Sequence, residues 1–208
     1  MKRKILIITF TICSISLFSQ QIELSGMYFG SSTNMFKNTF GYGISYNQLF
    51  TKSKLGIEIS QCVNKTKYDD FYRSLSTADI IAEDIRPNNH RIFFKLKYGL
   101  NIVHSQFSNI YIGPNVSLNY FDINEEYYVY NPIIDTKYQR NFSQKSKIGT
   151  GFFIDFEFNE IIQKNISIFM STNMERTNFK TPFVIDDSHY PWGITWLGIQ
   201  LGIRYNLK

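Results

Sequence analysis

Apolar and polar residues alternate one by one along most of the chain beyond residue 20. In the C-terminal segment 197–207, every odd position is apolar, from Leu197 to Leu207, and every even position is glycine or polar. A period of two predicts a β-strand with one apolar face. The same alternation recurs in seven further segments, at 22–28, 40–47, 55–64, 92–102, 110–120, 148–158 and 166–175. The pattern therefore predicts an all-β protein with eight strands.

The lengths of the strands and of their connections favour a membrane barrel. Most of the segments are ten or eleven residues long, as a tilted transmembrane strand requires, whereas ordinary strands are shorter. Short links are expected around Lys52, Gln106 and Ile162, and long ones at 66–90, 122–146 and 177–192. Short turns at one end and long loops at the other are typical of outer-membrane barrels. We predict an eight-stranded antiparallel up-and-down transmembrane β-barrel with short periplasmic turns and long extracellular loops.

The positions of the glycines indicate that the polar face lines the lumen. Nine of the twelve glycines occupy polar-face positions, where a narrow barrel needs small residues among large ones. The lumen would then hold charges of both signs, and buried charges must be paired. The expected lumenal charge network consists of Glu23, Glu58, Lys95, Lys97, Asp155, Glu157, Glu175 and Arg204. The alternative is a soluble periplasmic barrel of the lipocalin kind, with the apolar face inside and a hydrophobic ligand bound there.

The N-terminal segment 1–20 has the features of a cleaved secretory signal peptide, followed by a barrel domain at 21–208. Lys2-Arg3-Lys4 precedes an apolar run of 14 residues, Ile5–Phe18, which is short for a membrane-spanning helix. Without these three basic residues, the balance of 22 Lys+Arg against 17 Asp+Glu becomes 19 against 17. The charge therefore does not support a nucleic-acid partner. The mature chain would keep a single cysteine, Cys62, which we expect to be buried and inert.

The last strand carries a motif of bacterial outer-membrane barrels. Gln200, Gly202, Tyr205 and Leu207 match the barrel-assembly signal, although Lys208 follows where many barrels end at an aromatic residue. The mature chain resembles small Bacteroidetes-type outer-membrane β-barrel proteins, the broad family that includes PorT-like proteins. The resemblance implies insertion by the barrel-assembly machinery into the outer membrane of a Gram-negative bacterium. It implies no particular activity, since the members of this family differ widely in function.

Candidates for catalysis or metal binding are few. None of the three histidines is spaced for a metal site with another histidine or a cysteine: His90, His104 and His189. Two residues after His104 stands Gln106, where barrel lipid A deacylases have a serine. Asp187 and His189 share a loop, but catalytic roles need convergent geometry rather than adjacency. We expect no catalytic residue, no metal site, no cofactor and no enzymatic activity.

Aromatic residues gather in the segments expected to be long loops. Exposed Tyr and Trp are typical contact residues. A loop contact surface would be formed by Tyr72, Tyr127, Tyr128, Tyr130, Tyr190 and Trp192. The other interpretation of 122–146 is a hairpin in which two strands extend above the membrane and bend at Asn131-Pro132. Within 66–90, the segment Ala78–Asp84 is expected to form a short helical turn.

The favoured function is that of a non-enzymatic outer-membrane barrel, structural or binding an extracellular ligand through its loops, with membrane lipid around it. A narrow channel is disfavoured because an eight-stranded lumen is normally filled by side chains. A hydrolase using Asp187 and His189 is the enzymatic alternative. A role as an accessory of an outer-membrane secretion or transport system, with a secretion-system protein as partner, rests on the family resemblance alone.

Overall fold

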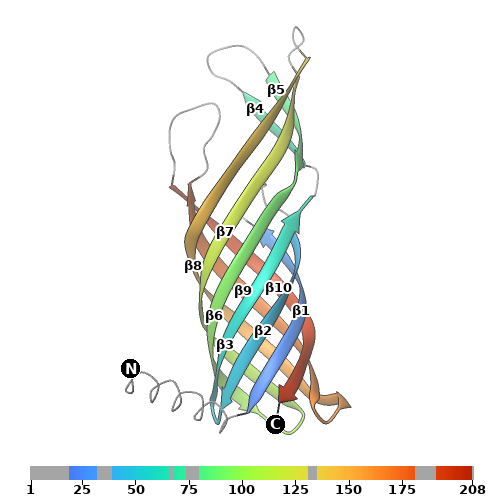
Figure 1. Cartoon of the computed structure of the whole chain (residues 1–208), viewed down its shortest axis with the longest axis vertical. Helices are drawn as coiled ribbons and strands as arrows, with labels where there is room; N and C mark the ends of the chain where they lie inside the picture. The colour runs from blue at the N-terminus through green and yellow to red at the C-terminus, as the bar shows by residue number, and fades with distance from the viewer. Residues whose placement is uncertain are drawn as a thin grey trace, which may run out of the picture.

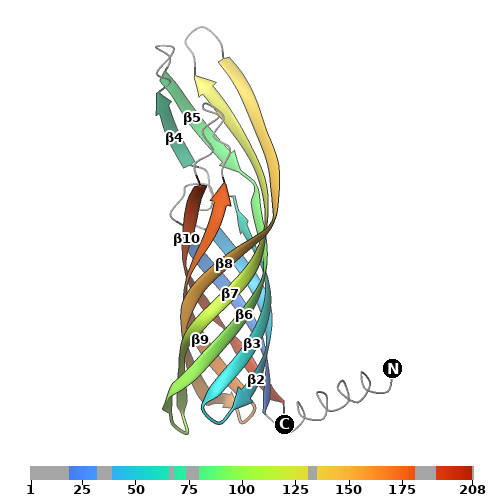
Figure 2. The same ribbon diagram turned by 90° about the vertical axis from the view of Figure 1, so that its left-hand side faces the viewer.

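The chain forms one antiparallel sheet that closes on itself, seen in Figure 1 and, after a quarter turn, in Figure 2. The computed structural model describes residues 19–31, 39–65, 68–73, 80–130, 135–180 and 191–207. The strands are β1 (Gln20–Ser31), β2 (Thr39–Phe50), β3 (Ser53–Asn64), β4 (Tyr68–Arg73), β5 (Ile80–Pro87), β6 (Asn89–His104), β7 (Ser108–Tyr130), β8 (Asp135–Gln163), β9 (Ile166–Lys180) and β10 (Pro191–Leu207). No helix within these ranges is both long and apolar enough to cross a membrane.

Eight of the strands make the barrel, in the order β1-β2-β3-β6-β7-β8-β9-β10, and β10 pairs with β1 to complete the ring. β1 pairs with β10 along the whole length of β1, from Gln20 opposite Leu207 to Ser31 opposite Trp196. Closure leaves no strand edge around this ring, which is what a sheet in lipid requires. The predicted eight-stranded antiparallel barrel is therefore confirmed.

Three short connections between barrel strands lie at one end of the barrel. They are formed by residues 51–52 between β2 and β3, residues 105–107 between β6 and β7, and residues 164–165 between β8 and β9. The last of these turns follows Ile162 by two residues. The beginning of β1 and the end of β10 lie at this same end. Of the predicted leader, only Ser19 and Gln20 fall within the described residues, and Gln20 already belongs to β1.

At the opposite end, four strands continue beyond the barrel as a sheet in the order β4-β5-β7-β8 (Figure 2). We call this part the upper sheet. β7 reaches Tyr130 and β8 begins at Asp135, and the two strands pair from Tyr130 and Asp135 down to the barrel. The extended-hairpin interpretation of 122–146 is thus confirmed, and the prediction of a long loop there is wrong. Residues 131–134, with the expected bend at Asn131-Pro132, lie outside the described residues.

The prediction for 66–90 needs a second correction. Residues 80–84, which were expected in a helical turn, belong to strand β5, while Ala78 and Asp79 lie outside the described residues. β5 pairs with β7 in the same register as β6 does, so it prolongs β6 beyond an interruption at Asn88. The backbone N–H of Asn88 still donates to the carbonyl of Asn124, at 2.7 Å. The partner strand β7 thus supplies hydrogen bonds that an isolated helical turn would not gain, and tertiary pairing decides the local conformation.

Burial alternates along each strand and shows which face lines the lumen. In β1, Glu23 and Met27 are buried whereas Leu24 is 61% exposed, and in β10, Arg204 is buried whereas Leu197 is 65% exposed. The apolar face therefore points outward all around the barrel. A lipocalin-like barrel needs the opposite arrangement, so that alternative is contradicted.

The glycines of the polar face leave room for side chains that fill the lumen and for the backbone of neighbouring strands. At each of the nine, an added Cβ would come within 3.1 Å of another atom. At Gly202 it would lie 2.8 Å from the Phe169 ring, and at Gly99 it would lie 3.1 Å from the Phe153 ring. By contrast, a Cβ on the outward-facing Gly26 would meet no atom within 4 Å. The lumen is therefore packed and the lumenal glycines are a steric requirement.

Candidate functional site

The candidate site is the network of charged side chains in the lumen. Among the described residues, five carboxylates and five cations are buried: Glu23, Glu58, Asp155, Glu157, Glu175, Lys54, Arg91, Lys95, Lys97 and Arg204. All ten stand on the inward positions of barrel strands, because the period of two places every second side chain inside. The formal charges of these ten described residues cancel.

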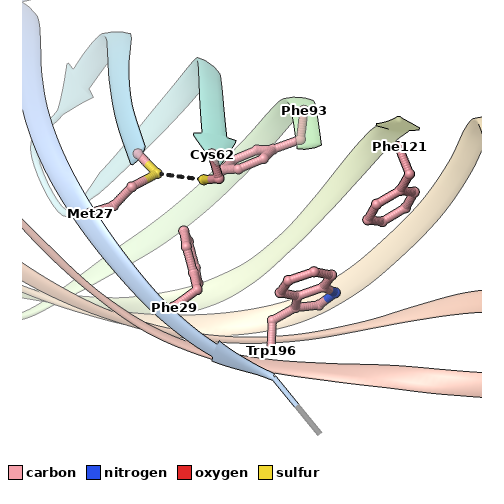
Figure 3. Close-up of a cluster of buried hydrophobic side chains, with 6 residues drawn as sticks. All are labelled: Met27, Phe29, Cys62, Phe93, Phe121 and Trp196. Carbon is pink, nitrogen blue, oxygen red and sulfur yellow. Dashed lines mark hydrogen bonds between the residues drawn. The ribbon is translucent and has the colours of Figure 1, made fainter. Parts of the chain in front are cut away.

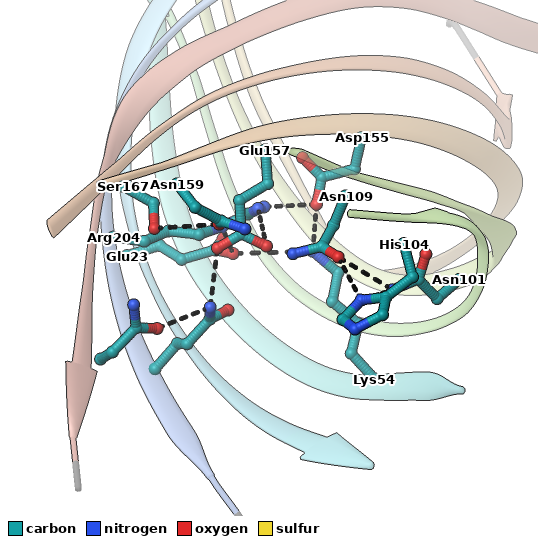
Figure 4. A network of polar contacts seen from close by, with 12 residues as sticks. Glu23, Lys54, Asn101, His104, Asn109, Asp155, Glu157, Asn159, Ser167 and Arg204 are labelled. Carbon is teal, nitrogen blue, oxygen red and sulfur yellow. Dashed lines mark hydrogen bonds and ion pairs between the residues drawn. The ribbon is translucent and has the colours of Figure 1, made fainter. Parts of the chain in front are cut away.

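The inner group of the network lies near the short turns and centres on Arg204 (Figure 4). Nε of Arg204 is 2.5 Å from Oε1 of Glu23, Nη1 is 3.4 Å from Oε2 of Glu157, and Nη2 forms an ion pair with Asp155. Lys54 forms a second ion pair with Asp155, and its Nζ lies 4.6 Å from the centre of the Tyr111 ring. A planar guanidinium that reaches three carboxylates links β1, β8 and β10 across the lumen.

Above this group, Lys97 and Glu58 form the middle of the network. Nζ of Lys97 is 2.6 Å from Oε2 of Glu58 and 3.9 Å from Oε2 of Glu23, so Lys97 connects the middle to the inner group. The amide of Gln200 donates to Oε1 of Glu58 at 2.9 Å, and the hydroxyl of Ser60 donates to the same oxygen at 2.9 Å. These neutral donors supply the hydrogen bonds that a buried carboxylate needs beyond its ion pair.

The outer group lies towards the upper sheet and centres on Glu175. Its Oε1 is 2.5 Å from Nη2 of Arg91 and accepts a hydrogen bond of 2.6 Å from Ser117. Its Oε2 is 3.3 Å from Nζ of Lys95. Nε of Arg91 also donates to Oδ1 of Asn119 at 2.7 Å. One carboxylate therefore holds two cations at this level of the lumen.

The sequence-predicted network contains eight of these ten residues, and the structure brings all eight together inside the barrel. Lys54 and Arg91 were missed because the expected strands began one residue too late, at Leu55 and Ile92. Continuing the alternation back by two from Gly56 and Phe93 would have found both residues. A second signal was the charge count, since the eight predicted residues hold five carboxylates against three cations.

At the short-turn end, the residues flanking the network are amides and one histidine. Nδ1 of His104 lies 2.7 Å from Oδ1 of Asn109, and the amide nitrogen of Asn101 donates to the same oxygen at 3.2 Å. The hydroxyl of Ser105 forms hydrogen bonds with the carbonyl and the hydroxyl of Ser108 rather than with His104. The described residues hold no group of three or more His, Cys, Asp and Glu side chains arranged around a metal position.

Four of the six residues of the predicted loop contact surface belong to strands of the upper sheet. Tyr72 belongs to β4, and Tyr127, Tyr128 and Tyr130 belong to β7. Trp192 belongs to β10, where it is paired with Phe179 of β9, so it lies in a strand rather than in the predicted loop. Tyr190, Asp187 and His189 lie outside the described residues. The residues of the assembly signal, Gln200, Gly202, Tyr205 and Leu207, all belong to β10.

Comparison with known proteins identifies the fold but no family. No protein-family model and no curated protein matches the sequence. A major outer membrane protein from Thermus thermophilus is similar in structure, with a TM-score of 0.55 and 11% identity over 91% of this chain and 99% of that one. The chain has the fold of a small outer-membrane β-barrel. The attachment invasion locus protein Ail of Yersinia pestis, solved with the heparin analogue sucrose octasulfate, has a TM-score of 0.50 and 12% identity, with 91% and 99% of the two chains covered.

Proposed function

We propose that this protein is a non-enzymatic barrel of the outer membrane of a Gram-negative bacterium, which binds a partner outside the cell through its upper sheet. The observation that carries the proposal is the upper sheet itself, which rises beyond the strands β1, β2, β3, β9 and β10 (Figure 2). A barrel whose only task were to span the membrane would have no use for strands of 23 and 29 residues, since about 9–11 residues suffice to cross a bilayer.

The outward surface supports the membrane location. Large apolar side chains are exposed on every strand of the barrel, among them Leu24, Ile57, Leu96, Phe152 and Leu201. A soluble protein rarely exposes an apolar surface that surrounds the whole molecule, whereas lipid is the natural environment for such a band. Tyr42, Tyr46, Tyr98 and Tyr205 are also exposed, and tyrosine suits the boundary between lipid and water.

The arrangement of the polar residues supports a binding role over an enzymatic one. Every carboxylate of the lumenal network is held by at least one cation within the packed lumen. A general acid or base needs access to a substrate, and these groups have none. Binding to a surface partner instead requires only an accessible platform, which the upper sheet provides.

The proposal is tested by shortening the hairpin of β7 and β8. Residues 123–142 are replaced by Asn-Gly, so that the two strands end near the barrel. Purified wild-type and shortened barrels in detergent are then applied to arrays of glycans and extracellular-matrix proteins. Binding by the wild type and its loss in a shortened barrel that still folds is the expected result. Equal binding by both barrels would remove the upper sheet from the function.

The C-terminal strand supports a finer assignment, namely a Bacteroidetes-type, PorT-like barrel inserted by the barrel-assembly machinery. Tyr205 and Leu207 stand at the end of β10, the strand that closes the ring. A role beside a secretion system is the second candidate, and it rests on this resemblance. Co-purification of the tagged barrel from crosslinked cell envelopes tests it, since a secretion component should appear with the wild type and with the shortened barrel.

A further inference from the structure

Arg91 lies inside a collar of aromatic side chains at the outer end of the lumen. Its Cζ is 4.1 Å from the centre of the Trp196 ring and 4.5 Å from that of Phe93, with Phe29 at 5.8 Å and Phe121 at 5.9 Å. Figure 3 shows these four rings, with Met27 and Cys62, surrounding a common space. We call this set the aromatic collar. A guanidinium is attracted by ring faces and is less strongly hydrated than an ammonium group, so it suits such a site.

Polar contacts hold the guanidinium in the collar. Arg91 is fully buried. Its Nη2 lies 2.5 Å from Oε1 of Glu175, and its Nε donates a hydrogen bond of 2.7 Å to Oδ1 of Asn119. These partners come from β9 and β7, while the collar rings come from β1, β6, β7 and β10. A single side chain of β6 therefore contacts residues of β1, β6, β7, β9 and β10.

The collar lies towards the extracellular end of the lumen, and Asn64 and Asn89, which are also buried, lie one inward position further out. Arg91 is the third residue of β6, which runs from the upper sheet down to the short turns, and Lys95 and Lys97 follow it along the lumen. We propose that Arg91 is the stopper that closes the lumen against water and solutes from the extracellular side. The inner group around Arg204 is a separate closure at the periplasmic side.

Arg91 closes the lumen through the volume of its side chain as well as through its charge. A packed barrel interior relaxes only partly when a large side chain is deleted. Without Arg91, the space between the rings of Phe93 and Trp196 would be open, and the carboxylate of Glu175 would draw water into it. The same loss at Arg204 would open the lumen at its other end and leave the collar closed.

The protein contains a reporter for this state. Cys62 belongs to the collar, is 1% exposed, and lies directly opposite Arg91 in the pairing of β3 with β6. Its Sγ is 3.5 Å from Sδ of Met27. A thiol in this position reacts with a water-soluble reagent only when the reagent can enter the collar.

The experiment measures the labelling of Cys62 by a small, membrane-impermeant, sulfonated maleimide applied to intact cells. The variants are Arg91→Ala, Arg204→Ala and Arg176→Ala, the last an exposed arginine on the outward face of β9. Cys62→Ser reports any background labelling. The wild type, Arg204→Ala and Arg176→Ala are expected to react slowly, whereas Arg91→Ala should react at least about tenfold faster, because burial of the thiol is lost.

Two results would overturn the proposal. One is rapid labelling of the wild type, which would mean that the lumen is open from outside. The other is an Arg91→Ala barrel that folds, as judged by resistance to SDS when unheated, and whose thiol stays unreactive. Should Arg91→Ala not fold, Trp196→Ala widens the same collar while keeping every ion pair, and it carries the same expectation. None of these readouts involves a surface partner, so they are independent of the proposed binding function.

Discussion

Substitution of single residues inside this barrel is constrained because the lumen is tightly packed and its buried charges are paired. The five carboxylates and five cations among the described lumenal residues are each within 4 Å of an opposite charge. Desolvating an ion costs several kcal/mol, and a close partner offsets that cost only while both remain. Removing one member is therefore expected to be worse than removing a pair.

Arg204 offers the sharpest test of this balance. Arg204→Met keeps much of the volume but removes the ion pair of Glu157 and leaves Asp155 to Lys54. Glu23 keeps only the more distant Lys54 and Lys97, at 3.8 and 3.9 Å. We expect a loss of about 3–5 kcal/mol in the free energy of unfolding, measured by urea titration of the folded band in cold SDS gels. The matched change Arg176→Met, on the exposed face, should shift stability by less than about 0.5 kcal/mol. Equal effects of the two changes would contradict the network.

The tight packing of the lumen is tested by substituting two glycines on neighbouring strands. An added Cβ at Gly198 would come within 3.0 Å of the Phe29 ring, whereas one at Gly26 would meet nothing within 4 Å. Gly198→Ala is expected to cost about 1–3 kcal/mol through overpacking. Gly26→Ala should be neutral or gain about 0.4–1 kcal/mol, because alanine restricts the unfolded chain. The same urea titration distinguishes them, and equal stability of the two variants would mean that the lumen is not packed.

Among the elements, the strands of the upper sheet depend on one another. β7 is the central strand, because β5 pairs with one of its edges and β8 with the other, while β4 pairs with β5. A strand pair without a hydrophobic face or a third strand is marginal in water. β4 and β5 should therefore hold their conformation only while β7 is present beside them.

Shortening the hairpin at 123–142 tests that dependence. Without the upper part of β7, the ladder from Glu83, Arg86 and Pro87 to β7 is lost. A glutamate-specific endoproteinase is then expected to cut after Glu83, and the fragment beginning at Asp84 should keep the barrel strands. In the wild type, Glu83 lies in a strand paired with Val129 and should be cut much more slowly. Mass spectrometry of the digest identifies the cleavage sites, and rapid cleavage of the wild type after Glu83 would contradict the paired strand.

At the scale of the whole molecule, the ring of hydrogen bonds is the main source of cohesion. Each of the eight barrel strands has a partner on both sides, and in lipid an unpaired backbone group costs several kcal/mol. Opening the ring at any one place therefore exposes two edges at once. The barrel should unfold as one cooperative unit.

Gel mobility in SDS checks this expectation directly. The unheated protein should migrate differently from the boiled protein, because a closed barrel excludes the detergent until heat opens it. The shortened-hairpin variant should show the same shift, since its ring is intact. The protein should be found in the outer-membrane fraction, and recovery in the soluble periplasmic fraction would contradict the outward apolar band.

Much of the architecture could be read from the alternation of residues. A period of two, carried through segments of ten or eleven residues, is enough to predict the strands, and the positions of the glycines indicate which face lines the lumen. Strand ends were less predictable, since the expected strands missed Lys54 and Arg91 by one residue. β4 and β5 were not predicted, because 66–90 has no sustained alternation and its conformation depends on pairing with β7.

The sequence by itself determined that this chain is an eight-stranded barrel with an apolar exterior and a charged, glycine-containing lumen, because period-two patterning is a local property of the polypeptide. Only the tertiary structure decided which charges meet. The residues of the ion pair between Arg204 and Glu23 are separated by 181 positions, and those of the pair between Arg91 and Glu175 by 84. Such contacts follow from the register and shear of a closed sheet, which depend on all eight strands together, and so does the collar that encloses Arg91.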